Sequence, residues 1–307
     1  MPNTQPAEVI RLNSSGKLTY YKSPTGRLSL PRGCTGVADD ALKNNLDIKY
    51  FDTYYNGTDI GRFAFAFASN LQRAILRTGV TTIGTGAFQQ CSKLQYMIMP
   101  STINSLGDQV FHYCSELKHA DLSETQLTVL PTYTFSFCEQ LKAVDLPDKM
   151  DEIGRNAFQY CGALKTIKLP NALRVIDSEA FKNSGLVELT IPKATGVIGI
   201  CSFFECKDLT RLNFEADSVL EAIGTEAFAK TNLIDIHIPA SVQVIEKNAF
   251  ANCKNLVSVS FGSDAQMSML ANTVEIFNGC EKLAKIDFPR HAFHRVPGTN
   301  QWEAYKK

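Results

Sequence analysis

The sequence predicts an α/β solenoid, in which short units stack along one axis in a right-handed, curved coil. Parallel strands would line its concave face, and short turns or helices its convex face. Three observations support this fold class. Phe recurs about every 23 residues, a small or β-branched residue precedes each of these Phe, and Leu follows a few positions later. A period of roughly 20 to 50 residues is typical of stacked repeats, because one such unit cannot bury its apolar side chains alone.

Ten of the 19 Phe keep this spacing. They are Phe65, Phe88, Phe111, Phe135, Phe158, Phe181, Phe203, Phe228, Phe250 and Phe277. Three residues after most of them stands a Cys, which Ala, Ser or Thr replaces in the other repeats. These cysteines are Cys91, Cys114, Cys138, Cys161, Cys206, Cys253 and Cys280. Several residue types share one period, so we take that period to be the length of the structural unit.

The best-formed unit begins at residue 153 and reads IGxxAFxxCxxLxxIxLP. Its second half alternates apolar and polar residues with period two, as a half-buried strand does. We expect Leu164, Ile167 and Leu169 to point into the stack, and Thr166 and Lys168 to point outward. The closing Pro ends the strand, since it cannot donate to the next ladder.

The AFxxC segment of each unit is too short for a long helix, so we predict one helical turn on the side opposite the strand. The Gly that often follows the aliphatic residue, as in Ile153-Gly154, is interpreted as a turn residue. No GxGxxG or GK[ST] pattern accompanies these Gly, so they do not indicate a phosphate-binding loop.

The unit resembles the leucine-rich repeat of the BspA-like family, and the resemblance runs from about Val37 to Pro289. It implies a leucine-rich-repeat solenoid of about ten to eleven repeats. A degenerate first repeat is expected from Val37, because Ala41-Leu42 stands 23 residues before Ala64-Phe65. The resemblance also implies adhesion, since BspA-like proteins are commonly surface proteins of anaerobic bacteria and parasitic protists that bind host matrix proteins.

Three segments follow from the extent of the repeats. Residues 1–36 carry no repeat signal and are expected to cap the first exposed sheet edge, residues 37–289 to form the solenoid, and residues 290–307 to form a second cap or a tail. The only Trp, Trp302, is expected to pack on the last repeat, or alternatively to belong to a docking peptide.

Nine cysteines is an odd number, and none of them stands in a CxxC pair. This argues against a disulfide framework and against a four-cysteine zinc site. Those on the repeat are expected to be free, buried and to act as small hydrophobic groups. Cys34 and Cys201 lie off the period.

The composition is that of an ordinary folded protein, with 31 basic and 31 acidic residues. No net charge draws the chain to nucleic acid, and no stretch of roughly 20 apolar residues predicts insertion into a membrane. The first residues show no secretory signal, which favours a cytoplasmic location over the cell surface as the alternative.

No catalytic or cofactor-binding motif is present, so we expect neither an enzyme nor a cofactor. Two His-Asp pairs are predicted on the outward side of strands, His119 with Asp121 and Asp235 with His237. His237 could also lie near Ser258 or Ser260 on the next strand. An open sheet offers no oxyanion hole or enclosed pocket for a Ser-His-Asp relay. These pairs are therefore interpreted as ordinary side chains on a solvated face, and a metal site formed by His119, Asp121 and Asp145 is a minor alternative.

The same outward positions are better interpreted as a protein-binding surface. Ile75, Tyr96 and Ile98 would form an exposed apolar patch beside Arg73, and His119 with Asp121 would follow on the next strand. Apolar patches, aromatic residues and Arg are frequent at contact sites. Alternatively, the N-terminal segment folds over the patch. The insertion Asp52–Gly57 would add two tyrosines to either arrangement.

The sequence therefore predicts a non-enzymatic protein-binding scaffold that uses the concave face of a solenoid, with a protein of unknown identity as its partner. Two alternatives remain: a cell-surface adhesin or antigen that binds host matrix proteins, and a structural component of a cytoskeletal or flagellar assembly.

Overall fold

The computed structural model describes residues 8–54, 59–263, 273–288, 291–296 and 302–306. It divides into two compact units. Unit 1 comprises Met1–Pro147 with Cys161–Ala163, and unit 2 comprises Asp148–Tyr160 with Leu164–Lys307. Each unit is a parallel β-solenoid, and the chain makes about 11 turns in all. The solenoid fold predicted from the sequence is confirmed. Its handedness and curvature remain predictions.

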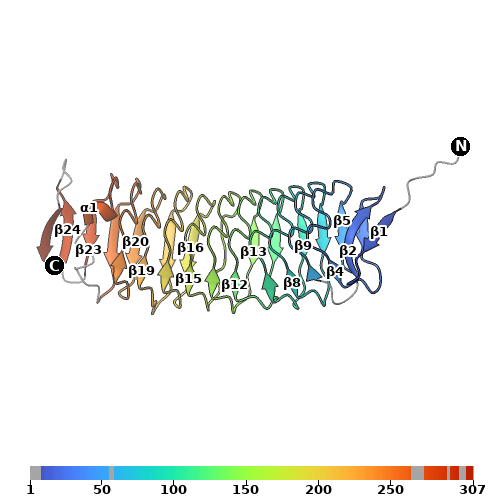
Figure 1. Ribbon diagram of the computed structural model, residues 1–307. Helices are drawn as coiled ribbons and strands as arrows, with labels where there is room; N and C mark the ends of the chain where they lie inside the picture. The colour runs from blue at the N-terminus through green and yellow to red at the C-terminus, as the bar shows by residue number, and fades with distance from the viewer. Residues whose placement is uncertain (1–7, 55–58, 264–272, 289–290, 297–301, 307) are drawn as a thin grey trace. The chain divides into compact units, whose positions relative to one another are not determined.

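Unit 1 has two ladders of short strands, which Figure 1 shows in blue to green. We call them the back and the front sheet. The back sheet runs in the order β1 (Val9–Leu12), β2 (Lys17–Lys22), β4 (Gly36–Val37), β6 (Asp59–Ile60), β8 (Thr82–Ile83) and β10 (Ser105–Leu106). The front sheet contains β3 (Arg27–Ser29), β5 (Tyr50–Asp52), β7 (Arg73–Ile75), β9 (Tyr96–Ile98), β11 (His119–Asp121) and β13 (Ala143–Asp145). A further strand, β12 (Val129–Leu130), also belongs to this unit.

Unit 2 repeats the arrangement. One ladder joins β14 (Glu152–Ile153), β15 (Val175–Ile176), β17 (Val197–Ile198), β19 (Ala222–Ile223) and β21 (Val244–Ile245). A second pairs β16 (Glu188–Ile191) with β18 (Arg211–Phe214). A third joins β20 (Asp235–Ile238), β22 (Ser258–Phe261), β23 (Lys285–Asp287), β24 (His291–Arg295) and β25 (Trp302–Lys306).

The periodic Phe residues form a column in each unit. Ring centroids of successive Phe lie 5.0–5.9 Å apart from Phe65 to Phe135, and 5.1–5.5 Å apart from Phe158 to Phe277. The rings are nearly parallel and almost completely buried. Offset stacks at this distance add to the energy of burial. The period in the sequence is therefore the rung spacing of an apolar column.

The segment around each Phe is a turn and not a helix. The only helix in the described part of the chain is α1 (Thr273–Ile276), so the predicted helical turn does not form in most repeats and the α/β class is not confirmed. In most of these turns two non-glycine residues have positive φ, as Phe63 (51°) and Phe67 (62°) do. Their amides donate to the next repeat, Phe67 N to Gln89 O at 2.8 Å. These bonds compensate for a strained conformation that costs about 1–2 kcal/mol per residue.

The recurring Gly after the aliphatic residue serves close packing and is not a turn residue. At Gly107, a Cβ would lie 2.6 Å from Thr85 Cα of the preceding repeat, and at Gly224 it would lie 2.8 Å from Gly199 C. Neither Gly has positive φ. The successive turns approach so closely here that a side chain would collide with backbone.

The segment chosen as the best-formed strand departs from the prediction. Leu164 and Leu169 are buried, Thr166 and Lys168 are exposed, and Ile167 is half-buried, which agrees with the expected alternation. However, residues 165–169 are not part of a ladder. Period two therefore predicted the direction of the side chains but not the pairing.

Antiparallel hairpins stand at the beginning and the end of the strand order. In unit 1, β2 pairs with β1 on one side and in parallel with β4 on the other, so the hairpin covers the edge of the back sheet. In unit 2, β24 and β25 continue the ladder beyond β23. Trp302 begins β25 opposite Arg295. The predicted boundary at residues 289–290 lies outside the described residues.

Candidate functional site

The front sheet of unit 1 aligns chemically distinctive side chains in rows. Its register places Arg27, Tyr50, Arg73, Tyr96, His119 and Ala143 on successive strands. We call these residues the first row. Asp52, Ile75 and Ile98 form a second row two residues further along the strands. Because side chains of alternate residues share one side of a sheet, both rows project from the same surface, which we call the front face.

The centre of the front face is apolar and open. Tyr96 is 53% and Ile98 is 48% exposed, while Ile75 beside them is half-buried. A hollow of about 430 Å³ lies over the three central strands. It is lined by Arg73, Tyr96, Met97, Ile98, Met99, His119 and Asp121. The structure thus brings together the residues selected from the sequence, with Ile75 in register beside the hollow, and adds two buried Met.

The described part of the N-terminal segment does not cover this patch. Residues 9–22 form the hairpin at the edge of the back sheet, whereas Tyr96 and Ile98 belong to the front sheet. In the insertion, Tyr54 is exposed and the guanidinium of Arg77 lies 5.7 Å from its ring centroid. Residues 55–57 of the insertion lie outside the described residues.

Two arginines on the front face have different surroundings. Arg77 makes two hydrogen bonds to the Asp52 carboxylate, at 2.8 and 2.7 Å, and these bonds lower the pKa of Asp52. Arg73 is exposed and adds only a longer-range attraction to Asp52. Within the described residues, its guanidinium has no hydrogen bond, ion pair or ring contact. Asp52 is thus neutralised by Arg77, and the guanidinium of Arg73 has no partner of its own among the described residues.

The predicted pairing of His119 with Asp121 is wrong. His119 Nε2 lies 2.7 Å from Asp145 Oδ2 on the next strand, and Asp121 instead accepts hydrogen bonds from Ser123 N at 3.0 Å and Ser123 Oγ at 2.7 Å. The Ser123 bonds lower the pKa of Asp121. Neighbouring strands are roughly 4.8 Å apart, whereas residues i and i+2 of one strand are almost 7 Å apart. The imidazole therefore contacts the residue on the next strand and not the one on its own strand.

His237 also contacts the next strand and does not bond Asp235. Its Nδ1 lies 3.0 Å from Ser260 Oγ, its neighbour in register, which confirms the alternative expected for this residue from the sequence. His237 is exposed and has no carboxylate partner in the described part of the chain. A Ser-His contact without an orienting acid or an enclosing pocket lacks the groups that activate a Ser nucleophile. In the same residues, no group of three or more His, Cys, Asp or Glu is arranged to hold a metal ion.

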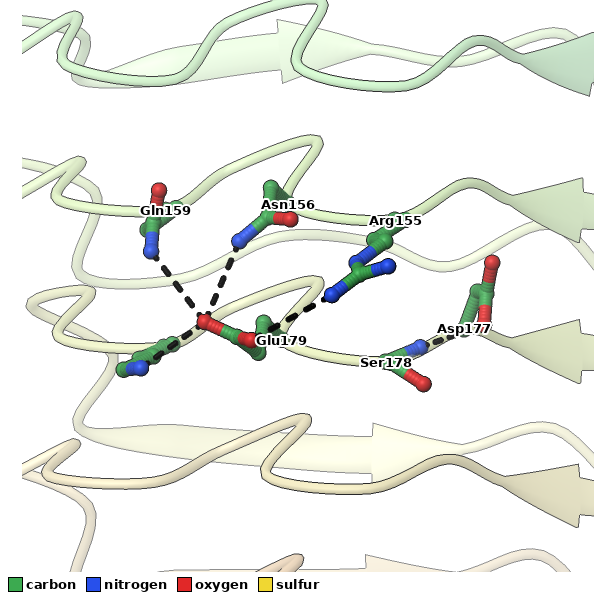
Figure 2. Close-up of polar contacts among 7 residues, drawn as sticks. Arg155, Asn156, Gln159, Asp177, Ser178 and Glu179 are labelled. Atoms are coloured by element: carbon green, nitrogen blue, oxygen red, sulfur yellow. Dashed lines mark hydrogen bonds and ion pairs between the residues drawn. The ribbon is translucent and has the colours of Figure 1, made fainter.

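A polar network that the sequence did not predict surrounds Glu179 in unit 2 (Figure 2). Its carboxylate accepts hydrogen bonds from Lys182 at 2.8 Å, Asn156 at 3.3 Å and Gln159 at 3.4 Å, and Arg155 lies 3.8 Å away. Burial raises the pKa of Glu179, but the Lys182 bond and charge outweigh it, so the net shift is downward. The network joins two successive turns. Because protein groups already surround the carboxylate, we assign it to stability.

The comparison with protein families decides the identity of the repeat. A model described as the BspA-type leucine-rich repeat region, of six copies, matches residues 13–142, 58–188, 128–257 and 174–295. The chain belongs to this family. The matches to this BspA-type protein overlap, as expected when a short unit recurs in many copies. No helix in its described residues is long and apolar enough to span a bilayer.

Solved structures resemble the BspA-type chain over most of its length. A leucine-rich repeat protein from Bacteroides ovatus is 21% identical, with 93% of this chain and 94% of that chain covered and a TM-score of 0.54. A leucine-rich cell surface protein from Faecalibacterium prausnitzii is 22% identical, with 92% and 95% covered and a TM-score of 0.44. The leucine-rich repeat protein of T. pallidum is 18% identical, with 75% and 88% covered and a TM-score of 0.41. No curated protein matches the chain. At these identities the likeness concerns the fold alone.

Proposed function

We propose that the chain is a non-enzymatic scaffold that binds another protein through the front face of unit 1. The observation that carries the proposal is the exposed apolar patch of Tyr96 and Ile98, next to the unpaired Arg73 and in a hollow of about 430 Å³. Exposed apolar patches with aromatic and Arg residues are typical of protein contacts. Membership in a leucine-rich repeat family supports the same interpretation.

The shape of the site favours a macromolecular ligand. Small molecules usually bind in pockets that enclose most of their surface, whereas this hollow lies on a sheet whose rows continue on both sides. His119 and His237 each contact one side chain on the neighbouring strand, Asp145 and Ser260 respectively. These contacts give no support to a catalytic role.

The test compares capture of a partner by three forms of the intact chain. Proteins bound by the wild type are identified from native extracts and then measured with the double variant Tyr96→Ser, Ile98→Ser. We expect capture to fall by tenfold or more, because each truncated interface anchor typically costs about 2 kcal/mol or more.

The matched control is Val197→Ser, Val244→Ser, which removes two comparably exposed apolar side chains from β17 and β21 of unit 2. It should capture as the wild type does. If both double variants capture the partner as well as the wild type does, the front face of unit 1 is not the binding site.

The location separates two versions of the proposal. A cell-surface adhesin is the version implied by the BspA-type family, and a cytoplasmic scaffold is the other. Treating intact cells with a protease distinguishes them: rapid cleavage of this chain, with a cytoplasmic marker left intact, supports the adhesin. Cleavage only after lysis supports the cytoplasmic scaffold.

A further inference from the structure

The first row of the front face alternates cationic and aromatic side chains. Arg27, Tyr50, Arg73 and Tyr96 follow one another in register. The guanidinium of Arg27 lies 4.9 Å from the centroid of the Tyr50 ring, and the Tyr50 hydroxyl donates to Gln72 Oε1 at 3.2 Å. Arg27 and Tyr50 are therefore already paired with each other, while Arg73 and Tyr96 have no such partner in the described residues.

The charges of the face are distributed unevenly. At the β5–β7 end, Arg77 neutralises Asp52, so Arg73 leaves an excess of positive charge. At the β11–β13 end stand the exposed carboxylates of Asp121 and Asp145, of which Asp145 contacts His119. The two ends of the hollow therefore favour opposite charges. A ligand carboxylate is attracted to Arg73 and repelled from Asp121.

We infer that the front face of unit 1 binds an extended peptide segment in which an acidic side chain stands beside an apolar or aromatic one. The acidic group pairs with Arg73, and the apolar group covers Tyr96 and Ile98. Arg is suited to this role because its planar guanidinium forms bidentate hydrogen bonds with a carboxylate. The inference rests on the proposed function and names the class of partner that the site takes.

An apolar ligand group favours a peptide over an acidic polysaccharide. The exposed side chains of Tyr96 and Ile98 line the hollow together with Arg73, so a ligand has to match an apolar surface as well as a charge. A sulfated polysaccharide would satisfy Arg73 but would leave these apolar groups uncovered.

The test starts with a random peptide library displayed on phage and selected on the intact, immobilised chain. We expect the enriched peptides to contain Asp or Glu next to apolar or aromatic residues. The strongest peptide is then synthesised with its acidic residue intact and with that residue changed to the amide. Binding of both forms is measured with wild type and with Arg73→Gln.

Each single change should weaken binding about tenfold or more, and the two together should cost little beyond either one, since both remove the same charge-assisted pair. Arg73→Lys should restore binding only in part, because Lys lacks the bidentate geometry. The matched control is Arg211→Gln, at the equivalent place on β18, where the guanidinium is already paired with Glu188 at 2.7 Å. It should bind as the wild type does.

Several results would overturn the inference. Enriched peptides without acidic residues, which need Tyr96 but not Arg73, would refute the acidic partner and leave the proposed function intact. Heparin binding that depends on Arg73, without peptide enrichment, would indicate a polysaccharide instead. The absence of any enrichment would also refute the inference, whereas the capture experiment above decides the proposed function independently.

Discussion

At the scale of single residues, the cysteines of the repeat have a more specific role than filling space. Cys91 Sγ donates to Phe65 O at 3.1 Å, and Cys114 Sγ donates to Phe88 O at 3.2 Å. The same bond recurs at Cys138, Cys161, Cys206, Cys253 and Cys280. Thr231, which replaces Cys in one repeat, instead donates to Phe228 O of its own repeat. The cysteines therefore link successive repeats by supplying a thiol donor to a buried carbonyl of the preceding one.

These thiols predict a loss of stability in alkaline solution. Burial raises the pKa of Cys206 to about 12, and it also raises the pKa of Cys114 and of Cys138 well above the ordinary value of 9.0. Above pH 9, the thiols therefore stay protonated in the folded state but lose their protons in the unfolded state. Stability should be unaffected by these thiols below pH 9 and should fall as the pH rises above it, by up to about 1.4 kcal/mol per thiol and pH unit.

Urea unfolding between neutral pH and about pH 10.5 measures this effect. The variant Cys114→Ser, Cys138→Ser keeps donors at both positions but removes two titrating groups, so its stability should fall less steeply above pH 9. Equal slopes for the variant and the wild type would show that the thiols do not titrate on unfolding.

The residues selected from the sequence for the candidate site do gather, because the period of two assigns each of them to one side of a strand. Their partners were not predictable in the same way. The contacts of His119 and His237 depend on the register between strands, and register follows from the length of each intervening turn. Arg73 is unpaired because Arg77 binds Asp52 in its place. Arg77 lies beyond the end of β7, and no sequence pattern marked it as a partner of Asp52.

At the scale of elements, the spacing of successive turns depends on glycine. The Gly after each aliphatic residue lies against the backbone of the preceding turn, as Gly107 does against Thr85. Other repeats carry a larger residue at this position, such as Asp177 and Glu246. The close approach is therefore a local property of the turns that contain Gly.

Gly107→Ala should destabilise the chain by about 1–3 kcal/mol, because the added methyl group must displace backbone of a neighbouring turn. Gly162→Ala is the matched control, since a Cβ at that exposed position meets nothing within 4 Å. Urea midpoints of the two variants test the difference. Similar midpoints would indicate that the turns shift apart at little cost.

The elements themselves were predictable to different degrees. Phe and Leu periodicity predicted the core correctly, because burial of large side chains repeats with the unit. The turns were less predictable, since positive φ at residues such as Tyr113 and Glu205 is imposed by bonds to the next turn and not by residue type. Asn and Gly are the usual signals of this conformation, and here they occupy only some of the positions.

At the scale of the whole molecule, a stack of parallel strands must protect its ends. The hairpin of β1 and β2 covers β4, whose edge would otherwise present unpaired backbone groups to another chain. Exposed edges of this kind promote association. The division of the chain into residues 1–36, 37–289 and 290–307 remains a prediction about these ends.

Removing residues 1–22 should lower the melting temperature and make the protein associate as its concentration rises. Light scattering over a concentration series, with the full chain measured in parallel, reports the association. A shortened chain that stays monomeric, with its melting temperature unchanged, would show that the hairpin is not needed as a cap.

The register of the front sheet in unit 1 has a metric consequence. Side chains of the first row follow one another at one strand spacing, roughly 4.8 Å, while an extended chain advances about 3.3 Å per residue. Two rungs, from Arg73 to His119, therefore span about three residues of a ligand lying along the row. The side chains of the row and those of such a ligand therefore repeat at different distances, so they coincide only at certain positions. Gaining or losing one whole turn beside the patch would change their phase without requiring a new fold.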